Sequence, residues 1–489
     1  MDIPSGARAA RPHVAVIGGG VAGLTAAYHL VREPGPAPRV TVFEGGPRAG
    51  GKLRVSEIAN VPVDEGAESM LARRPEGIAL AGALGLGDAL VHPAPVPAAL
   101  LSYGALRPFP ARQIQGIPAD PDALAASGVL SAAGVARVRE DRSLPPTPLD
   151  DDVPVAAYVG ARMGDEVVNR LVEPLLGGVY AGRADRLSLA ATLPAVYQAA
   201  REHTSLLDAA NSLLPAPASG APGPVFATID GGMGRLAETL VAELLRSGSA
   251  EVRTSAMVRE LARTEEGWRL TVGPACHPEY VEADAVIIAV PARPASRLLA
   301  GVAPVASRNL ARIEYASVGL VTLAYPAAAF PEPPSGSGYL VPAVETGRTG
   351  ERRAVKAVTF VTTKWPQVAA RAGDLVIARC SLGRHGDEHV LQRDDADLVA
   401  LATAELADVC GVTGPPAATR VTRWGGGLPQ YGVGHLDLVA AVRADVASVP
   451  GLAVCGAAYD GVGVPACAAT ARAAAGSVRA GLTAAQEWT

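Results

Sequence analysis

The feature that most constrains the fold is the glycine pattern Gly18-x-Gly20-x-x-Gly23, which lies between an apolar run and a helical segment. The run His13–Ile17 is typical of a buried parallel strand, and residues 24–32 have helical character. Glu44 ends the next apolar strand, about 20 residues beyond the last glycine, as the dinucleotide fingerprint requires. This order predicts a βαβ unit that binds a dinucleotide.

Each part of the pattern has a chemical reason. The glycines allow a tight turn and the close approach of a pyrophosphate to the backbone. The helix N-terminus offers free N–H groups and the positive end of its dipole. Glu44 is placed to accept hydrogen bonds from ribose hydroxyls. A glycine turn alone could be structural, but strand, helix and acid together favour the nucleotide site.

Two further segments extend this interpretation. Arg48-x-Gly50-Gly51-Lys52 would form a second glycine turn, which a nicotinamide site does not require and which would clamp an extended dinucleotide. Residues 461–465 precede the last helix, whose N-terminus would stabilise negative charge on a flavin ring. The alternatives are an ordinary surface turn and a helix that simply begins well at Pro465.

Two other motifs do not predict a functional site. Residues 231–234 are glycine-rich but lack a third glycine and a following acid, so they predict a helix-starting turn and no separate NAD(P)H site. His385-Gly-Asp-Glu388-His389 fits an H-x-x-E-H zinc pattern, yet Gly386 opposes the helix that this pattern needs. We therefore expect a solvated loop there, and we predict no metal site.

Composition narrows the class of protein. A net charge of −5 and an aromatic content of 4% argue against a nucleic-acid partner. Five scattered cysteines without a C-x-x-C predict buried, reduced thiols. No apolar run is long enough to span a membrane, and residues 1–12 lack the apolar core of a signal peptide. The expected location is the cytoplasm. Residues 74–99 are predicted to be helical, and 215–224 to be a linker.

The chain resembles the flavin-containing amine oxidase superfamily and, more narrowly, its protoporphyrinogen/coproporphyrinogen oxidases. It is most similar to the actinobacterial coproporphyrinogen III oxidases, which form coproporphyrin. Beyond the two glycine turns, the resemblance rests on residues 64–69, 173–182, 424–435 and 456–467.

The resemblance implies an α/β fold. A Rossmann-like FAD-binding domain would be assembled from residues 1–100, 225–300 and 424–489. A helical cavity subdomain would comprise residues 101–224, and an α+β substrate-binding domain residues 301–423.

The resemblance also implies the activity: oxygen-dependent, six-electron oxidation of coproporphyrinogen III to coproporphyrin III in haem biosynthesis, with release of hydrogen peroxide. FAD would be non-covalent, because no Cys or His lies in a matching attachment context. The product would pass transiently to a ferrochelatase. The alternatives are a protoporphyrinogen IX oxidase, an amine oxidase, for which aromatic residues are scarce, a carotenoid-type desaturase, and a flavoprotein without turnover.

The predicted site residues are of two kinds. No protein acid or base is expected to be catalytic, because pyrrole tautomerisation can move the protons. Arg112 is the first candidate for a substrate propionate and Arg183 the second. The predicted FAD contacts are Gly18, Gly19, Gly20, Val21, Ala22, Gly23, Glu44, Gly45, Lys52, Gly66, Ala67, Glu68, Ser69, Val258, Trp424, Val462, Gly463 and Val464.

Overall fold

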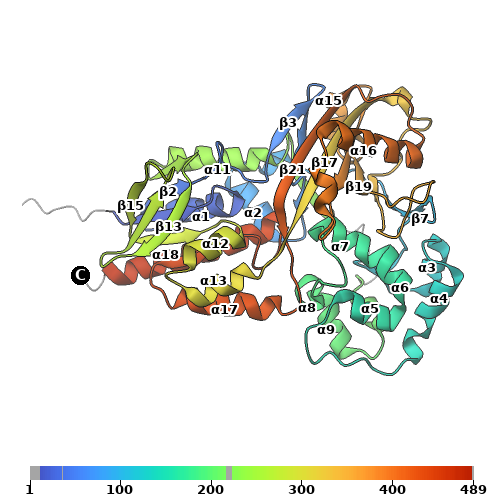
Figure 1. The fold of residues 1–489 in the computed structure, drawn as a ribbon, viewed down its shortest axis with the longest axis horizontal. Helices are drawn as coiled ribbons and strands as arrows, with labels where there is room; N and C mark the ends of the chain where they lie inside the picture. The colour runs from blue at the N-terminus through green and yellow to red at the C-terminus, as the bar shows by residue number, and fades with distance from the viewer. Residues whose placement is uncertain (1–10, 36, 216–222, 487–489) are drawn as a thin grey trace, which may run out of the picture.

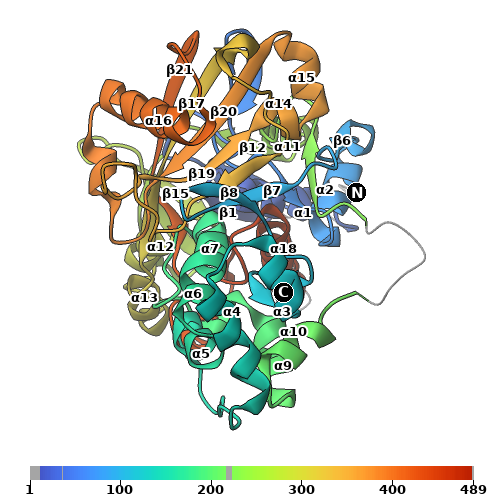
Figure 2. The ribbon, with the colours of Figure 1, turned by 90° about the vertical axis from the view of Figure 1, so that its right-hand side faces the viewer.

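The computed structural model describes residues 11–35, 37–215 and 223–486. The chain forms an elongated molecule with one large sheet toward each end and a group of short helices below the second sheet (Figure 1). Figure 2 looks along the long axis and shows the short helices clustered beneath the second sheet.

The first sheet has five parallel strands in the order β12-β2-β1-β16-β22. Its strands come from separate parts of the chain: β1 (His13–Ile17), β2 (Arg39–Phe43), β12 (Ala250–Arg253), β16 (Ala285–Ile288) and β22 (Leu452–Val454). β1 and β16 are apolar and buried throughout, because both faces of the sheet are covered.

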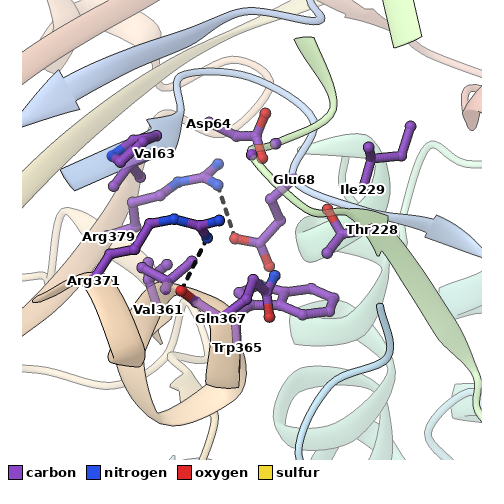
Figure 3. Close-up of a pocket in the computed structure, with 14 residues that line it drawn as sticks. Val63, Asp64, Glu68, Thr228, Ile229, Val361, Trp365, Gln367, Arg371 and Arg379 are labelled. Carbon is purple, nitrogen blue, oxygen red and sulfur yellow. Dashed lines mark hydrogen bonds and ion pairs between the residues drawn. The ribbon is translucent and has the colours of Figure 1, made fainter. Parts of the chain in front are cut away.

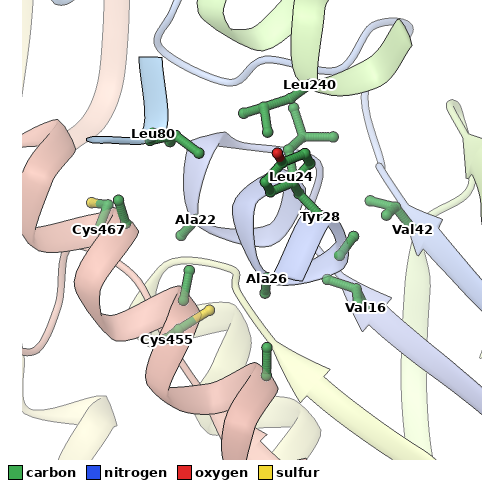
Figure 4. Packing of buried hydrophobic residues seen from close by; sticks show 14 of the residues in the cluster. Val16, Ala22, Leu24, Ala26, Tyr28, Val42, Leu80, Leu240, Cys455 and Cys467 are labelled. Carbon is green, nitrogen blue, oxygen red and sulfur yellow. The ribbon is translucent and has the colours of Figure 1, made fainter. Parts of the chain in front are cut away.

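Three helices pack on one face of this sheet: α1 (Val21–Arg32), α11 (Gly234–Arg246) and α18 (Val464–Gln486). Figure 4 shows Ala22 on the side of α1 that faces the helix carrying Cys467, and Leu24 turned toward Leu240. Small alanines on α1 and α18 let the two helices lie close together. This packing fixes the glycine turn at the start of α1.

The other face of the sheet is covered by a three-stranded antiparallel sheet and three helices. The strands are β13 (Val258–Arg263), β14 (Trp268–Val272) and β15 (Glu279–Ala283), and the helices are α12 (Ala292–Leu299), α13 (Pro304–Ala311) and α17 (His435–Ala447).

The second large sheet has seven strands in the order β21-β17-β20-β19-β18-β7-β8. Helix α16 (Asp395–Cys410) covers one of its faces. The strands are β7 (Ala98–Ser102), β8 (Ala105–Pro108), β17 (Tyr315–Pro326), β18 (Gly338–Leu340), β19 (Val355–Phe360), β20 (Leu375–Leu382) and β21 (Ala418–Pro429).

The short helices form a separate apolar core, mainly from residues 117–214, which Leu100 and Tyr431 join. A buried ion pair between Arg162 and Asp141 lies inside this subdomain. Its helices are α3 (Pro121–Ser127), α4 (Ala132–Arg139), α5 (Val155–Met163), α6 (Asp165–Val167), a π-helical turn (Val168–Val172), α7 (Glu173–Tyr180), α8 (Leu189–Thr192), α9 (Pro194–Glu202) and α10 (Leu206–Ser212).

Small elements connect these bodies. The strands are β3 (Val55–Ile58), β4 (Val61–Asp64), β5 (Met70–Leu71), β6 (Leu90–Val91), β9 (Gln113–Ile114), β10 (Ile117–Pro118) and β11 (Phe226–Ile229). The helices are α2 (Pro75–Ala83), α14 (Val361–Lys364) and α15 (Pro366–Ala372). Short 3-10 turns lie at 87–89, 140–143, 327–329 and 388–392.

Two local predictions are wrong. The helix expected over residues 74–99 ends with α2, because Gly85 takes a φ of +72° and prolines follow at 93, 95 and 97. The cysteines are free, but Cys276 is exposed rather than buried. Most of the expected linker, at 216–222, lies outside the described residues, as do residues 1–10.

The domain division stays a prediction. Strand β21 crosses its boundary at residue 424, and β7 begins before its boundary at residue 101. Helix α13 packs against α12 and α17 in the first body, although it follows residue 301. Within the described residues, no helix is long and apolar enough to cross a membrane.

Candidate functional site

The first glycine turn follows β1 and is fixed by contacts with neighbouring backbone. Gly18 has a φ of +114°, and a Cβ there would lie 2.8 Å from the carbonyl oxygen of Ala289. A Cβ on Gly23 would lie 1.9 Å from the carbonyl oxygen of Gly18. These two glycines are required by the close packing of strand, turn and helix.

Gly20 differs from the other two. It is the N-cap of α1 in an extended conformation, and a Cβ there would meet nothing within 4 Å. The second glycine turn lies directly against the first, because Gly50 N donates to Gly19 O at 2.8 Å and Gly20 pairs with Gly50 in a β-bridge. The open space at this helix N-terminus, bounded by two glycine turns, fits a pyrophosphate.

Glu44 lies beside the first turn at the end of β2. Its carboxylate accepts hydrogen bonds from Gly19 N at 2.9 Å and from Gly46 N at 2.7 Å. Each carboxylate oxygen has a second lone pair, so both can still accept from ribose hydroxyls. Gly45 packs against Met257, where a Cβ would lie 2.6 Å from the Met257 methyl, and this contact brings Val258 to the same edge.

We expect Glu44→Ala to weaken FAD binding about tenfold to a hundredfold, since a hydrogen bond to a charged acceptor contributes about 1.5–3 kcal/mol. Flavin titration of the apoprotein measures the dissociation constant, and far-UV circular dichroism checks that the fold survives. An unchanged dissociation constant would remove Glu44 from the nucleotide site.

The segment after β4 passes the second glycine turn. A Cβ on Gly66 would lie 2.0 Å from Lys52 O, and Ala67 N donates to that same carbonyl at 3.3 Å. Trp424 reaches the segment from β21, where its indole N–H donates to Glu65 O at 2.7 Å. The Lys52 side chain is exposed, and desolvation by the protein around it lowers the pKa of its ammonium.

Glu68 lies at the border between this segment and the second large sheet. It forms ion pairs with Lys364 and with Arg379, and Figure 3 shows the pair with Arg379. The other terminal nitrogen of Arg379 donates to Gly66 O at 2.9 Å. Burial acts to raise the pKa of Glu68, but the two cations outweigh it and the pKa falls below its usual range. Glu68 is therefore held as a carboxylate that joins the two bodies.

Asp64, Glu68 and Arg379 line one small cavity, which has a volume of about 20 Å³ (Figure 3). Burial raises the pKa of Asp64 to about 7, against the opposing charge of Arg379. Its carboxylate accepts from Met233 N at 2.9 Å, at the start of α11. Asp64, Lys364 and Arg379 were not among the predicted site residues, because β4, α14 and β20, which carry them, meet only in the folded chain.

The C-terminal segment is held by Tyr431. Its hydroxyl donates to Ala457 O at 2.6 Å and accepts from Gly461 N at 2.8 Å. Val462 then packs against the core of the short helices, whereas Val464 begins α18 and packs in the first body. Residues 462–464 therefore lie where the two cores meet.

Both predicted substrate arginines lie at the surface with acids of their own. Arg112 has a φ of +60°, donates to the Asn211 side chain at 2.6 Å and lies 3.7 Å from an oxygen of Asp120. Arg183 forms a bidentate pair with Asp185 at 2.7 and 3.0 Å. Their role toward a propionate stays a prediction.

The histidines of the zinc-like pattern face separate acids. His385 Nε2 lies 3.2 Å from Glu314, and the exposed His389 lies 3.0 Å from Asp387. Residue 386 has a φ of +83°, and a short 3-10 turn begins only at Glu388. The two histidines are therefore not placed on one helix face.

Comparison with known proteins identifies the family of this chain. The family model described as "Flavin containing amine oxidoreductase" matches residues 21–479. The chain belongs to this family. The predictions of an α/β fold, an FAD cofactor and an FAD-dependent oxidoreductase are confirmed.

Individual relatives of this flavin amine oxidoreductase cover nearly its whole length. A Mycobacterium tuberculosis protein named coproporphyrinogen III oxidase is 40% identical over 95% of this chain and 96% of its own. A Bacillus subtilis protein of the same name is 30% identical over 94% and 96%. A solved Exiguobacterium structure, provisionally named a protoporphyrinogen oxidase, superposes with a TM-score of 0.82 at 29% identity, covering 96% of this chain and 99% of its own.

Proposed function

We propose that this chain is an FAD-dependent coproporphyrinogen III oxidase, which forms coproporphyrin III for haem synthesis. The single observation that carries the proposal is the near full-length similarity to mycobacterial and Bacillus proteins of that name. The FAD would be held non-covalently, and oxygen would be the electron acceptor. Localisation in the cytoplasm and transfer of the product to a ferrochelatase stay predictions.

The dinucleotide would be held by residues already placed together. The open N-terminus of α1 at Gly20 would receive the pyrophosphate, and Glu44 would bind a ribose. The segment from Gly66 to Ser69, Trp424 and residues 462–464 would surround the ring system. FAD held by these residues would supply two-electron redox chemistry for each oxidation step, with oxygen as the acceptor that would be reduced to hydrogen peroxide.

The protein's own contribution is positioning and the exclusion of water. Trp424 is fixed by the hydrogen bond that it donates to Glu65 O, and Gly66 by the one that its carbonyl accepts from Arg379. These two residues would therefore form a rigid wall beside the flavin ring. Pyrrole tautomerisation moves the protons of the substrate, so the reaction requires no strong protein base. This agrees with a site whose buried acid Glu68 is already committed to two cations.

A second candidate is protoporphyrinogen IX oxidation. The observation that favours it is the Exiguobacterium structure with its provisional name, together with a Macaca fascicularis protoporphyrinogen oxidase that is 29% identical over 95% of this chain. The two substrates differ in their carboxylates, because coproporphyrinogen carries four propionates and protoporphyrinogen only two.

We expect the purified protein to produce porphyrin fluorescence from coproporphyrinogen III in air, with hydrogen peroxide formed alongside. Parallel reactions with protoporphyrinogen IX, a monoamine and phytoene separate the porphyrinogen oxidase from an amine oxidase and a desaturase. A reaction without enzyme corrects for spontaneous oxidation. Turnover of the monoamine or phytoene in place of a porphyrinogen would overturn the proposal, as would an absence of turnover on all four.

A further inference from the structure

Lys356 is a buried cation with no acid beside it. Its residue is only 5% exposed, on strand β19 in the second large sheet. Among the described residues, the Lys356 ammonium forms no ion pair and no side-chain hydrogen bond, unlike Lys364, which pairs with Glu68. The guanidinium of Arg384 acts with burial to lower the pKa of Lys356. A buried charge without a partner is costly, so such a group calls for an explanation.

The register of the sheet shows which way Lys356 faces. Val355 pairs with Leu382 and Val358 with Cys380, and both valines pack in the core beneath α16. The register shifts between Val355 and Ala357, so one extra residue stands between these two inward valines. Lys356 and Ala357 therefore both lie on the opposite face of the sheet.

That opposite face extends toward residues 66–69, which are predicted to contact the flavin. Across it, Leu340, Ala357, Ser381 and Leu320 pair side by side, and the first three are partly exposed. Thr359, the next residue of β19 on this face, pairs with Arg379, which binds Gly66 and Glu68. Lys356 is three residues from Thr359, or about 10 Å along a strand. Lys356 and the predicted ring site thus share one face.

Helix α7 covers this face at the end of the sheet where β18 ends and β19 begins. Figure 2 shows α7 beneath β19, and the helix contacts both β18 and β19. A Cβ on Gly178 of α7 would lie 3.8 Å from Leu340, the partner of Ala357. The glycine keeps the helix surface flat over the sheet. Lys356 therefore lies near the junction of the sheet with α7.

The acids at this junction are already bound by backbone N–H groups. Arg384 Nη2 donates to Val341 O, and Val341 N donates to Lys356 O, each at 2.9 Å, so both cations flank one residue. Glu173 of α7 accepts from Ala184 N, and Glu405 of α16 accepts from Ala354 N and Val355 N. These acids act to raise the pKa of Arg384 against its burial, whereas Arg384 is the charge that acts on the pKa of Lys356. Burial and Arg384 lower the pKa of Lys356 to about 7.

We infer that Lys356, assisted by Arg384, binds one carboxylate of the substrate. The carboxylate would lie on the sheet face that also carries Thr359, near the junction of the sheet with α7. The inference rests on the proposed function, because a porphyrinogen supplies the carboxylates. An arriving carboxylate would provide the missing counter-charge and would make the ammonium a charge-assisted donor. The other explanation is that Lys356 is a neutral amine that only fills space.

Lys356→Met and Lys356→Arg test the inference in the FAD-loaded enzyme. We expect Met, which conserves volume without charge, to raise the KM for coproporphyrinogen III and the Kd of coproporphyrin III at least tenfold. Arg should retain most of the affinity. FAD content and the melting temperature report on folding, and Arg308→Met, at an exposed site on α13, is the matched surface control.

The pH profile separates binding from space-filling. Because the free ammonium has a pKa of about 7, the affinity of the unmodified enzyme for coproporphyrin III should fall as pH rises from 7 to 9, while the carboxylates stay ionised. Lys356→Arg, charged throughout, should lose this dependence, and Lys356→Met should bind weakly at every pH. If Lys356→Met does not fold, the pH dependence of coproporphyrin III binding by Lys356→Arg still distinguishes carboxylate binding from space-filling.

Three results would overturn the inference. The first is equal KM and Kd for the unmodified enzyme and Lys356→Met. The second is the same pH profile in the unmodified enzyme and in Lys356→Arg. In either case the proposed function stands, because the unmodified enzyme still turns over coproporphyrinogen III. Absence of turnover and of binding by the unmodified enzyme is the third result, and it overturns the proposed function as well.

Discussion

Gly20→Val should give a folded protein that carries no FAD. The backbone of residue 20 is extended at φ −76°, which any residue adopts, and a Cβ there meets no protein atom within 4 Å. The added side chain would instead occupy the space at the N-terminus of α1 where the pyrophosphate must approach. In the unmodified protein, acid precipitation should release FAD into the supernatant; the variant should release none.

Gly82→Val is the matched control, because a Cβ at this exposed position of α2 also meets nothing within 4 Å. It should bind FAD normally. The contrast with Gly23→Val is equally informative: a Cβ at position 23 would lie 1.9 Å from Gly18 O, so that variant should lose folded protein rather than the cofactor alone. A yellow Gly20→Val protein with full FAD content would contradict the placement of the pyrophosphate.

Arg162→Met should destabilise the subdomain of short helices by about 3–5 kcal/mol. Arg162 and Asp141 are 1% and 0% exposed at the side chain and lie 2.6 Å apart. Arg162 also donates to Pro145 O and Asp141 O, both at 2.6 Å. Without it, the buried carboxylate keeps only its bonds from Ser205 and Leu207. Urea denaturation and limited proteolysis measure the loss.

Arg142→Met controls for removing an arginine from the same subdomain. Arg142 and Asp208 lie 2.9 Å apart but are 57% and 46% exposed, so water screens the pair. Its loss should change the free energy of unfolding by less than about 1 kcal/mol. If both variants lost a similar free energy of unfolding, burial of the Arg162–Asp141 pair would not determine how much it contributes to stability.

The parts of the site that could be predicted from sequence are those that local backbone chemistry dictates. Gly18, Gly20 and Gly23 form one turn between consecutive elements, and Glu44 ends the very next strand, so spacing alone indicates their chemistry. The second turn was predicted as a clamp, and the Gly20–Gly50 bridge brings the two turns into contact. The FAD family is confirmed, whereas the individual contact residues stay predictions.

The parts that could not be predicted depend on long-range strand pairing. Arg379 reaches Glu68 only because β20 lies beside β19 in a sheet that draws strands from residue 98 to residue 429. Lys356 lies on the sheet face opposite α16 only because one extra residue interrupts the register of β19. Arg112 was chosen because the resembled family often keeps a cation for a propionate in the loop of residues 107–118, and Arg183 because arginine binds carboxylates. Both are engaged by local partners in the fold.

The most direct test of the central claim is the ratio of kcat/KM for coproporphyrinogen III to that for protoporphyrinogen IX, measured by porphyrin fluorescence on the same FAD-loaded preparation. A site built for four propionates should favour coproporphyrinogen by more than tenfold, since one charged contact contributes about 1.5–3 kcal/mol. Equal values of kcat/KM, or a preference for protoporphyrinogen, would contradict the assignment and favour the protoporphyrinogen oxidase instead.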